Sequence, residues 1–376
     1  MPGRNTEMTT SKTPVGRFRQ GLGLVGSYAI FISWALITII PLIWMGYSSF
    51  KSNEELTLDI YALPKALFDN KNDEYLVIPK SLNVILPYDP ELDTRERLII
   101  ESTTIAPTRR LMVHFLIKDE LPAGIAGLQP GDTLRVSQLP RAMQREIHWK
   151  TVWFNYSSAF IRGKLGGKFL NSVLYSGVST FFIVLLGLMA GFAVSKMGFK
   201  KLSLVIAGLI GFGYLISTNS VIIPLFLLLS KLRLTDTHLG VILAYTAFGL
   251  PLSVMLSAQF IKGLPDSLIE SAFIDGAGYF RIFFSIIVPM TVPVIVTISI
   301  ISALGIWNEF LLVLVIASSE LTKSLPVGVF SFSSLQSTQL GWQLAALVIA
   351  ILPAMLVYFI FNRRLTQGVV AGAMKG

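Results

Sequence analysis

The stretch Gly263–Pro293, GLPDSLIESAFIDGAGYFRIFFSIIVPMTVP, lies between long apolar segments and combines a helix start, a glycine-rich turn and a second apolar run. Pro265 suits the first position of a helix, where a missing N–H group has no cost, and Asp266 complements the positive helix start. Small and apolar residues then recur at helical spacing, which gathers them on one face: Ile269, Ala272, Phe273, Gly276 and Ala277. The stretch predicts an amphipathic helix that sits in a groove, with a helix lying on lipid headgroups as the alternative.

The composition is typical of an integral membrane protein. Hydrophobic residues make up 53% of the chain and charged residues only 14%, against about 25% charged residues in a soluble domain. Cysteine is absent, which excludes disulfides, thiolate metal sites and cysteine nucleophiles. The net charge of +9 arises outside residues 51–164, because the Lys and Arg residues of that region are balanced by equally many Asp and Glu residues. This distribution indicates membrane orientation rather than nucleic-acid binding.

Six apolar segments are each long enough to cross a hydrocarbon core, which needs about 20 residues. The first occupies residues 21–50, and its apolar run is too long for the core of a cleaved signal peptide, the alternative interpretation. The other five lie within residues 166–362 and run over Phe169–Val194, Leu202–Ser230, Leu239–Ile261, Thr291–Ala317 and Trp342–Phe361. We therefore predict an all-α polytopic membrane protein with six transmembrane helices, bent near Pro224 and Pro251.

Residues 51–165 differ from the rest of the chain. Charges of both signs are mixed there, and short apolar runs such as Leu111–Ile117 alternate with turn residues. This pattern predicts a small β-rich insert between the first and second transmembrane helices, with its most atypical part over about residues 69–150. His114 and His148 are far apart in the sequence, and no metal site is predicted from them.

The short loops indicate the orientation, because loops on the cytoplasmic side carry an excess of Lys and Arg. Basic residues gather in the two tails and in two of the short loops: residues 1–20, 195–201, 262–290 and 363–376. Both termini and the loop 263–293 are therefore expected in the cytoplasm. The insert 51–165 is expected on the opposite, extracytoplasmic side.

Three phrases of the opening stretch resemble the EAA loop found in permease subunits of ATP-binding-cassette (ABC) importers: Glu270-Ser271-Ala272, Asp275-Gly276-Ala277 and Ile286 to Pro289. Ser271 stands where the family loop has Ala, and Val288 where it has Leu. Further phrases resemble the carbohydrate-uptake branch, in particular the smaller maltose-type permease: Phe50–Glu54, Asn155-Tyr156, Asn171-Ser172, Ile223–Leu225, Trp307–Phe310 and Gln367–Gly376. The resemblance covers nearly all of residues 15–376 except about 69–150.

The resemblance implies a protein that works with other subunits. It implies a transmembrane permease subunit, not an enzyme, that forms half of the pathway for a sugar or oligosaccharide in a bacterial or archaeal cytoplasmic membrane. A second permease subunit would complete a heterodimer, two cytoplasmic ABC ATPases would drive alternating access, and an extracytoplasmic binding protein would deliver the substrate. ATP and Mg²⁺ would be used by those partners, so no cofactor is expected on this chain. Membrane lipid is expected to contact it, and nucleic acid is not.

Two groups of residues are implied to contact the ATPases. In the loop they are Glu270, Ala272, Asp275, Gly276 and Ala277. Glu270 would pair with a basic group of the ATPase, Gly276 would permit close approach, and Asp275 would contact the partner or cap the local turn. In the C-terminal tail they are Gln367, Gly368, Gly372 and Lys375, with a frayed, solvated tail as the alternative.

Polar residues inside apolar spans are candidates for the substrate pathway, because burying them in hydrocarbon is unfavourable. Asn219, Trp307, Asn308 and Glu309 qualify. Asn308 and Glu309 lie well inside the predicted fifth span, and the ring of Trp307 is suited to stacking on a sugar. Bonds to neighbouring helices are the alternative role for these side chains.

Other classes of function can be weighed against a permease subunit. An ATPase is excluded because the chain has no G-x-x-x-x-G-K-[ST] phosphate loop. A self-contained secondary transporter is expected to show inverted repeats and more ionisable groups near the middle of the bilayer. A membrane-anchored interaction protein built around residues 51–165 needs only one span. The last two classes stay open as alternatives.

Overall fold

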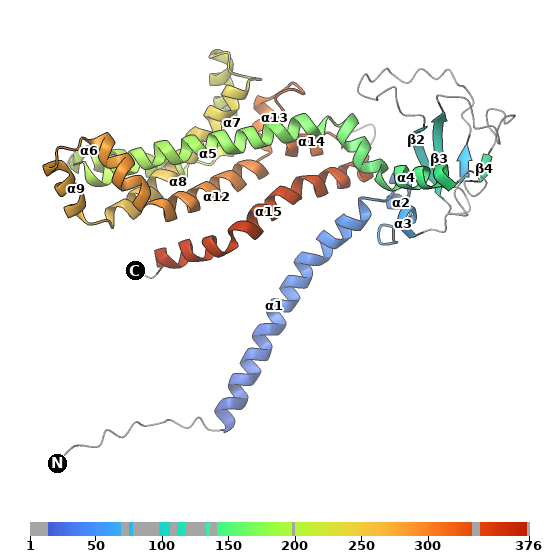
Figure 1. Cartoon of the computed structure of the whole chain (residues 1–376), viewed down its shortest axis with the longest axis horizontal. Helices are drawn as coiled ribbons and strands as arrows, with labels where there is room; N and C mark the ends of the chain where they lie inside the picture. The colour runs from blue at the N-terminus through green and yellow to red at the C-terminus, as the bar shows by residue number, and fades with distance from the viewer. Residues whose placement is uncertain are drawn as a thin grey trace.

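Long apolar helices make up most of the molecule (Figure 1). The computed structural model describes residues 14–68, 75–77, 98–105, 111–117, 133–135, 141–197, 200–332 and 339–373. Within these residues, four helices are long and apolar enough to cross a membrane, and the number rises to six if each of two bent helix pairs is one span. The prediction of a helical, polytopic membrane protein is confirmed.

Five long helices form the frame: α1 (Pro14–Ser48), α5 (Leu165–Lys196), α8 (His238–Lys262), α12 (Val292–Asn308) and α15 (Leu340–Ala373). Helices α5, α8, α12 and α15 run side by side, whereas α1 approaches the others at one end and diverges from them along its length (Figure 1). The side chains of α1 between Gly26 and Ser48 are accordingly largely exposed. This apolar surface is suited to contact with lipid or another subunit.

The centre of the bundle is the close contact between α5 and α8. A Cβ atom built on Gly187 would lie 1.9 Å from the Oγ of Ser253, and one built on Gly191 would lie 2.7 Å from the Cβ of Ser257. Each helix therefore presents two small residues four positions apart, a spacing that lets helix backbones approach closely in membranes. The Oγ of Ser253 donates a hydrogen bond across the interface to the carbonyl oxygen of Ile183, at 2.9 Å.

One predicted span, Leu202–Ser230, is broken in its middle, and a second break lies at the start of the predicted span Thr291–Ala317. Helix α6 (Lys200–Leu215) meets α7 (Thr218–Lys231) at 102°, and the segment Tyr279–Met290 meets α12 at 78°. The break between α6 and α7 occupies residues 216–217, and both α7 and α8 continue as helices through the prolines near which bends were predicted. The break between α6 and α7 was not predicted, whereas the bends expected near Pro224 and Pro251 stay predictions, because a membrane helix can continue through a proline.

The second break follows a segment of irregular helix: α10 (Tyr279–Ile282), the π-helix η3 (Phe283–Ile287) and α11 (Val288–Met290). Thr291 stands at the corner, is fully buried, and its Oγ1 donates a hydrogen bond to the carbonyl oxygen of Ile287 at 2.8 Å. The polar groups of this corner are thus paired within the protein, as membrane-embedded backbone requires.

The predicted fifth span ends earlier than expected. Helix α12 ends at Asn308, and Glu309 takes an extended conformation with φ −74° and ψ 134°. The chain continues in two short helices, α13 (Leu311–Ile316) and α14 (Leu325–Phe330).

The region 51–165 contains both helices and strands. Its helices are α2 (Asn53–Leu58), α3 (Lys65–Phe68) and α4 (Arg141–Arg162), and its strands are β1 (Tyr75–Val77), β2 (Leu98–Ile105), β3 (Leu111–Ile117) and β4 (Thr133–Arg135). The strands form one sheet in the order β2-β3-β1-β4, with β1 parallel to β3 and the other pairs antiparallel. Because α4 has 22 residues and the longest strand has 8, the described part of this region is mixed, and the term β-rich is not supported.

Helix α4 escaped the sequence analysis because its mean composition is polar. Its buried residues nevertheless follow helical spacing, with Val152, Asn155 and Ala159 facing inward. The Nδ2 of Asn155 donates hydrogen bonds to the carbonyl oxygens of Ser49 at 2.8 Å and of Lys51 at 2.7 Å. These bonds join α4 to the end of α1.

The sheet and helix α9 (Asp266–Ile274) lie at opposite ends of the long axis of the molecule (Figure 1). We refer to these as the sheet end and the α9 end. The last turns of α15 point toward the α9 end, and the start of α5 lies toward the sheet end.

Candidate functional site

The helix predicted in the opening stretch is α9, and the geometry of its two ends depends on specific residues. Pro265 is its N-cap residue rather than its first helical residue. At the other end Gly276 has a φ of +78°, in the left-handed region that glycine enters without a steric penalty. The N–H of Ala277 donates a hydrogen bond to the carbonyl oxygen of Ala272 at 2.9 Å, which closes the turn. A Cβ at Gly276 would meet no described atom within 4 Å, so conformation rather than crowding within this chain requires glycine.

The inner face of α9 is packed into the core of the bundle. Ile269 is 7% exposed and belongs to an apolar cluster. Its neighbours in the cluster come from α5, α8 and the segment after α9: Phe192, Ile261, Ile282 and Phe283. Ala272 and Ala277 are half-buried against the same cluster. The inner face of α9 is therefore in direct contact with the two central helices.

A polar contact also ties the start of α9 to the end of α5. The Nζ of Lys196 lies 2.5 Å from the Oδ1 of Asp266 and donates a hydrogen bond to the carbonyl oxygen of Leu264 at 2.7 Å. The Lys196 side chain is 6% exposed, whereas that of Asp266 is 74% exposed. From the sequence, Lys196 was predicted only as one of the basic residues of the loop 195–201, because its contact with Asp266 depends on tertiary packing.

The outer face of α9 and the turn after it are exposed. The acidic residues Glu270 and Asp275 lie on this surface, beside Ile274, which is 86% exposed, and Phe280, which is 70% exposed. The rings of Phe273 and Tyr279 meet edge to face, with centroids 5.0 Å apart. An exposed surface that combines apolar side chains with carboxylates is typical of a docking site for another protein. Of the expected ATPase-contact residues, Glu270, Asp275 and Gly276 are exposed on this loop, whereas Ala272 and Ala277 are half-buried against the core.

The C-terminal residues implied to contact the ATPases lie in or beyond α15. Gln367, Gly368 and Gly372 are part of this helix, which continues to Ala373, and Lys375 lies outside the described residues.

The candidate pathway residues near residue 308 have three different environments. Trp307 is buried, and its Nε1 donates a hydrogen bond to the carbonyl oxygen of Ala350 at 3.1 Å. Its ring meets Phe169 with centroids 5.6 Å apart. These contacts match the alternative role given for Trp307, a bond to a neighbouring helix, and stacking on a sugar stays a prediction. Asn308 is exposed, and its Nδ2 bonds the carbonyl oxygen of Leu304 in its own helix, at 2.8 Å.

Glu309 stands at a helix break, and so the expectation that it and Asn308 lie well inside the span is wrong. One carboxylate oxygen accepts a hydrogen bond from the N–H of Leu312 at 2.9 Å, at the start of α13. The other accepts a hydrogen bond from the hydroxyl of Tyr245 on α8, at 2.8 Å. The carboxylate thus stabilises both the helix start and the contact with α8. Asn219 lies apart from this group, exposed in the first turn of α7.

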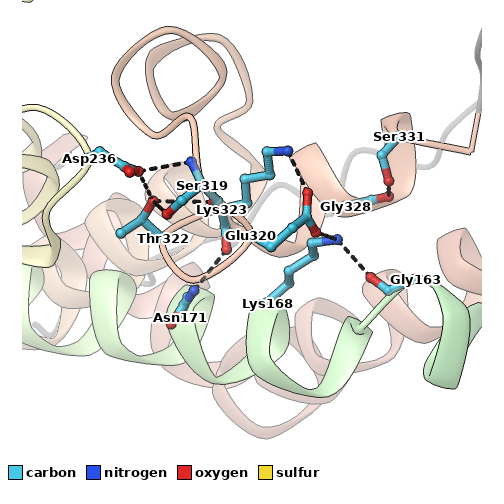
Figure 2. A network of polar contacts seen from close by, with 10 residues as sticks. All are labelled: Gly163, Lys168, Asn171, Asp236, Ser319, Glu320, Thr322, Lys323, Gly328 and Ser331. Atoms are coloured by element: carbon cyan, nitrogen blue, oxygen red, sulfur yellow. Dashed lines mark hydrogen bonds and ion pairs between the residues drawn. The ribbon is translucent and has the colours of Figure 1, made fainter. Parts of the chain in front are cut away.

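The sequence analysis missed a polar network that holds the loop between α13 and α14 (Figure 2). Four residues on one face of α5 bind this loop: Lys168, Asn171, Ser172 and Tyr175. Asn171 donates hydrogen bonds to the carbonyl oxygens of Leu321 at 2.7 Å and of Lys323 at 2.9 Å (Figure 2). Polar residues at positions i, i+3, i+4 and i+7 of an apolar helix were the available signal.

Ion pairs and a second carboxylate complete this network (Figure 2). Glu320 accepts the Nζ of Lys168 at 2.7 Å and the Nζ of Lys323 at 2.6 Å. Burial acts to raise the pKa of Glu320, but the hydrogen bonds from these two lysines outweigh it and hold the pKa below its usual range. Asp236 accepts hydrogen bonds from the Oγ1 of Thr322 and the N–H of Ser319, which lower its pKa. We refer to this set of contacts as the loop latch.

Known proteins share both the sequence and the arrangement of this chain. Residues 183–370, which include α9 and the turn after it, match the family described as the inner membrane component of binding-protein-dependent transport systems. The chain belongs to this family. Membership places the permease among transport proteins rather than enzymes, as the sequence predicted.

Named relatives of the permease extend the match. It is 32% identical over 230 residues to the diacetylchitobiose uptake system permease protein of Streptomyces coelicolor, covering 61% of this chain and 75% of that one. It is 30% identical over 223 residues to the melibiose/raffinose/stachyose import permease protein of Bacillus subtilis, covering 59% of this chain and 80% of that one.

A solved structure shares the fold of the permease. A chain of a bacterial ABC transporter involved in the import of the acidic polysaccharide alginate superimposes with a TM-score of 0.58 over 92% of this chain and 97% of that one. The sequence identity is 16%, so the likeness concerns the fold alone.

Proposed function

We propose that this permease is one of the two membrane subunits of an ABC importer for a sugar or oligosaccharide. The observation that carries the proposal is the two-sided geometry of α9, whose outer face is open to a partner while Ile269 and Lys196 connect its inner face to α5 and α8. Such a helix is built to receive force from another subunit. The names of the relatives, which are permeases for saccharides, favour a saccharide as the substrate.

The assembly that we propose contains a second, different permease subunit, two cytoplasmic ABC ATPases and an extracytoplasmic binding protein. The ATPases bind and hydrolyse ATP with Mg²⁺, and this chain binds no cofactor. Glu270 pairs with a basic group of the ATPase, and Asp275 contributes to the same surface. We also propose that the C-terminal residues Gln367, Gly368, Gly372 and Lys375 contact the ATPases, a proposal favoured by the last turns of α15 pointing toward the α9 end.

The proposed orientation puts the α9 end and both termini in the cytoplasm of a bacterial or archaeal cell. The positive-inside distribution of Lys and Arg supports this orientation. The sheet end, with the insert of residues 51–165, then faces the side from which substrate arrives. There it is placed to dock the binding protein, contact the second permease subunit or brace the outer gate.

The pathway runs past the break between α12 and α13 in this proposal. Asn308 is exposed there, and Glu309 is half-buried with both oxygens bonded. Asn308 is therefore the better candidate for substrate contact, while Glu309 supports the shape of the wall. Asn219 at the start of α7 is a second candidate.

Replacement of Gly276 tests the docking of the ATPases. Gly276→Val forces a β-branched residue to a φ of +78°, at a cost of about 1–2 kcal/mol, and distorts the turn that presents Glu270 and Asp275. Gly278→Ala is the matched control, because Gly278 lies in the same turn at a φ of −78° with no described atom near its Cβ position. We expect the valine variant, and not the control, to lose the ATPases on purification of the co-expressed complex.

The thermal unfolding of the membrane subunit is measured in parallel. If the Gly276→Val variant unfolds to the same extent as it loses the ATPases, the loss comes from instability. Normal co-purification of a folded variant contradicts the docking role. Uptake of saccharide that needs only an ion gradient, without ATPases, would indicate the secondary transporter instead.

A further inference from the structure

A cavity of about 370 Å³ opens at the sheet end, where the end of α4, the start of α5 and the start of α15 meet. The lining residues that matter here are Arg162, Lys164, Lys168, Glu320, Gln339 and Trp342. The volume is within the range of about 300–1,000 Å³ that is usual for small-molecule sites. None of the proposed coupling or pathway residues lines it.

The charges around the cavity leave an excess of positive charge. Glu320 is the one carboxylate among the lining residues, and both of its oxygens are bound by lysines, Lys168 and Lys323. Arg162 and Lys164 are exposed and have no carboxylate partner within 4 Å among the described residues. These two cations are therefore available to an anionic ligand.

Aromatic side chains form one wall beside these cations. The guanidinium of Arg162 lies 5.1 Å from the ring centroid of Trp342, a distance at which stacking holds the cation in place. The rings of Phe154 and Phe332 meet Trp342 edge to face, at 6.4 Å and 6.3 Å between centroids. Arginine held in this way presents a planar pair of N–H donors, which matches the geometry of a carboxylate.

The backbone between α4 and α5 is strained at the cavity. Lys164 has a φ of +49° and a ψ of 39°, which is uncommon for a residue other than glycine. The preceding Gly163 is packed so tightly that a Cβ would lie 2.3 Å from the ring of Phe332 and 2.4 Å from the carbonyl oxygen of Ala159. Strain of this kind persists where the surroundings hold it, and often at ligand sites. Here it fixes the turn that carries Lys164 at the mouth of the cavity.

We propose that this cavity binds the carboxylate of an acidic saccharide, a uronate residue, with Arg162 and Lys164 as the cationic contacts and Trp342 as the wall beside the sugar ring. The inference rests on the proposed function as a saccharide importer and specifies the substrate class. A cavity of this size has room for one sugar ring. An acidic side chain of a docking protein would need only the two exposed cations and not the cavity, so we favour the sugar.

Titration of the purified complex in nanodiscs of uncharged lipid tests this proposal, with calorimetry as the readout. The probes are trigalacturonate and, as the neutral match, maltotriose. We expect trigalacturonate to bind and maltotriose to bind at least about tenfold more weakly, because each charge-assisted hydrogen bond is worth about 1.5–3 kcal/mol and 1.4 kcal/mol corresponds to tenfold. Arg162→Gln is expected to weaken trigalacturonate binding by about tenfold.

Two further variants make the test specific. Lys164→Asn removes the second cation but keeps a residue type that tolerates positive φ, and it is expected to weaken binding several-fold. Lys231→Gln removes an exposed lysine at the end of α7, outside the cavity, and is expected to leave binding unchanged. An equal loss in Lys231→Gln and Arg162→Gln would show a non-specific charge effect and overturn the proposal.

Other results also decide the matter. Absence of trigalacturonate binding to the wild-type complex overturns the proposal, as does equal binding of the neutral probe. Loss of the extracytoplasmic binding protein in Arg162→Gln, without any trigalacturonate binding in the wild type, assigns the cations to protein docking instead. A complex that still takes up a neutral oligosaccharide with ATP, yet fails to bind trigalacturonate, contradicts the acidic-substrate inference and leaves the proposed function intact.

Discussion

The ammonium group of Lys196 connects the start of α9 to α5, which packs closely against α8. Its Nζ is shared between the carboxylate of Asp266 and the carbonyl oxygen of Leu264, and its side chain is almost fully buried. A residue in this position holds the start of α9 against the end of α5. We therefore expect Lys196 to act in the transmission of force rather than in the binding of the ATPases, since the outer face of α9 does not include it.

Lys196→Met is expected to separate ATP hydrolysis from transport. The apolar side chain keeps most of the packing but loses both polar contacts, so α9 can move without pulling α5. In reconstituted proteoliposomes, ATP hydrolysis should continue while saccharide uptake falls several-fold. Lys262→Met is the matched control, because Lys262 is exposed at the end of α8 near the same loop. Equal uptake in the two variants would show that the contact has no role in coupling.

Glu320 makes the loop latch sensitive to acid. Its pKa is held below the usual range by Lys168 and Lys323, so its contribution to stability is complete above the ordinary carboxyl pKa and is lost as the pH falls through the lowered value. The Glu320→Gln variant should therefore unfold at a lower temperature than the wild type at pH 7. The two unfolding temperatures should converge in acid. A difference that stays constant between pH 7 and pH 3 would mean that the ion pairs do not stabilise the latch.

At the scale of secondary-structure elements, the contact between α5 and α8 depends on the absence of side chains. Gly187 and Gly191 face Ser253 and Ser257, and the space between the helices is too small for an added methyl group. Dispersion contacts between closely packed backbones take the place of the hydrophobic effect inside a membrane. The pair also carries the mechanical connection from α9, because Phe192 and Ile261 belong to the cluster around Ile269.

Gly191→Ala is expected to destabilise the bundle by about 1–3 kcal/mol, the usual cost of overpacking. A Cβ there would lie 2.9 Å from the backbone nitrogen of Ala258 and 2.7 Å from the Cβ of Ser257, so the helices must move apart. Gly177→Ala is the control, because Gly177 lies on the same helix with no described atom within 4 Å of its Cβ position. Thermal unfolding in detergent measures the difference. A Gly191→Ala protein as stable as the control would refute close packing at this point.

The broken elements were the least predictable. The sequence predicted bends only near Pro224 and Pro251, yet the chain breaks at residues 216–217, at Thr291 and at Glu309. Apolar composition indicates that a segment can lie in lipid, but it does not indicate where the helix axis changes direction. The direction is set by tertiary contacts, such as the carboxylate of Glu309 bound both to Tyr245 and to the start of α13.

At the scale of the whole molecule, the two functional ends are separated by the length of the bundle (Figure 1). The insert is attached at the sheet end through α4, which contacts α15 and α5 as well as α3. Among the described elements, β2 joins the sheet to α4 and α2. We therefore expect the long helices of the bundle to keep their packing without the sheet.

Removal of the sheet is expected to spare the coupling function. Because α3 contacts α4, a short Gly/Ser linker can join Phe68 to Arg141 in place of residues 69–140. The shortened protein should still purify with the ATPases, since α9 and its anchors are unchanged. Binding of the extracytoplasmic protein, measured on the same sample, reports whether the sheet has a docking role. A shortened protein that no longer retains the ATPases would show that the insert is required for the fold of the bundle.

The sequence by itself determined the membrane setting, the family resemblance, the presence of the helix α9 and the need for glycine near residue 276. These are properties of composition, charge distribution and local spacing, which each short segment carries independently. Only the tertiary structure decided where the spans break, that Trp307 is a packing residue, how Lys196 holds α9 and how α5 latches the loop before α14. Each of these depends on groups tens of residues apart in the chain, and their meeting follows from packing rather than from local pattern.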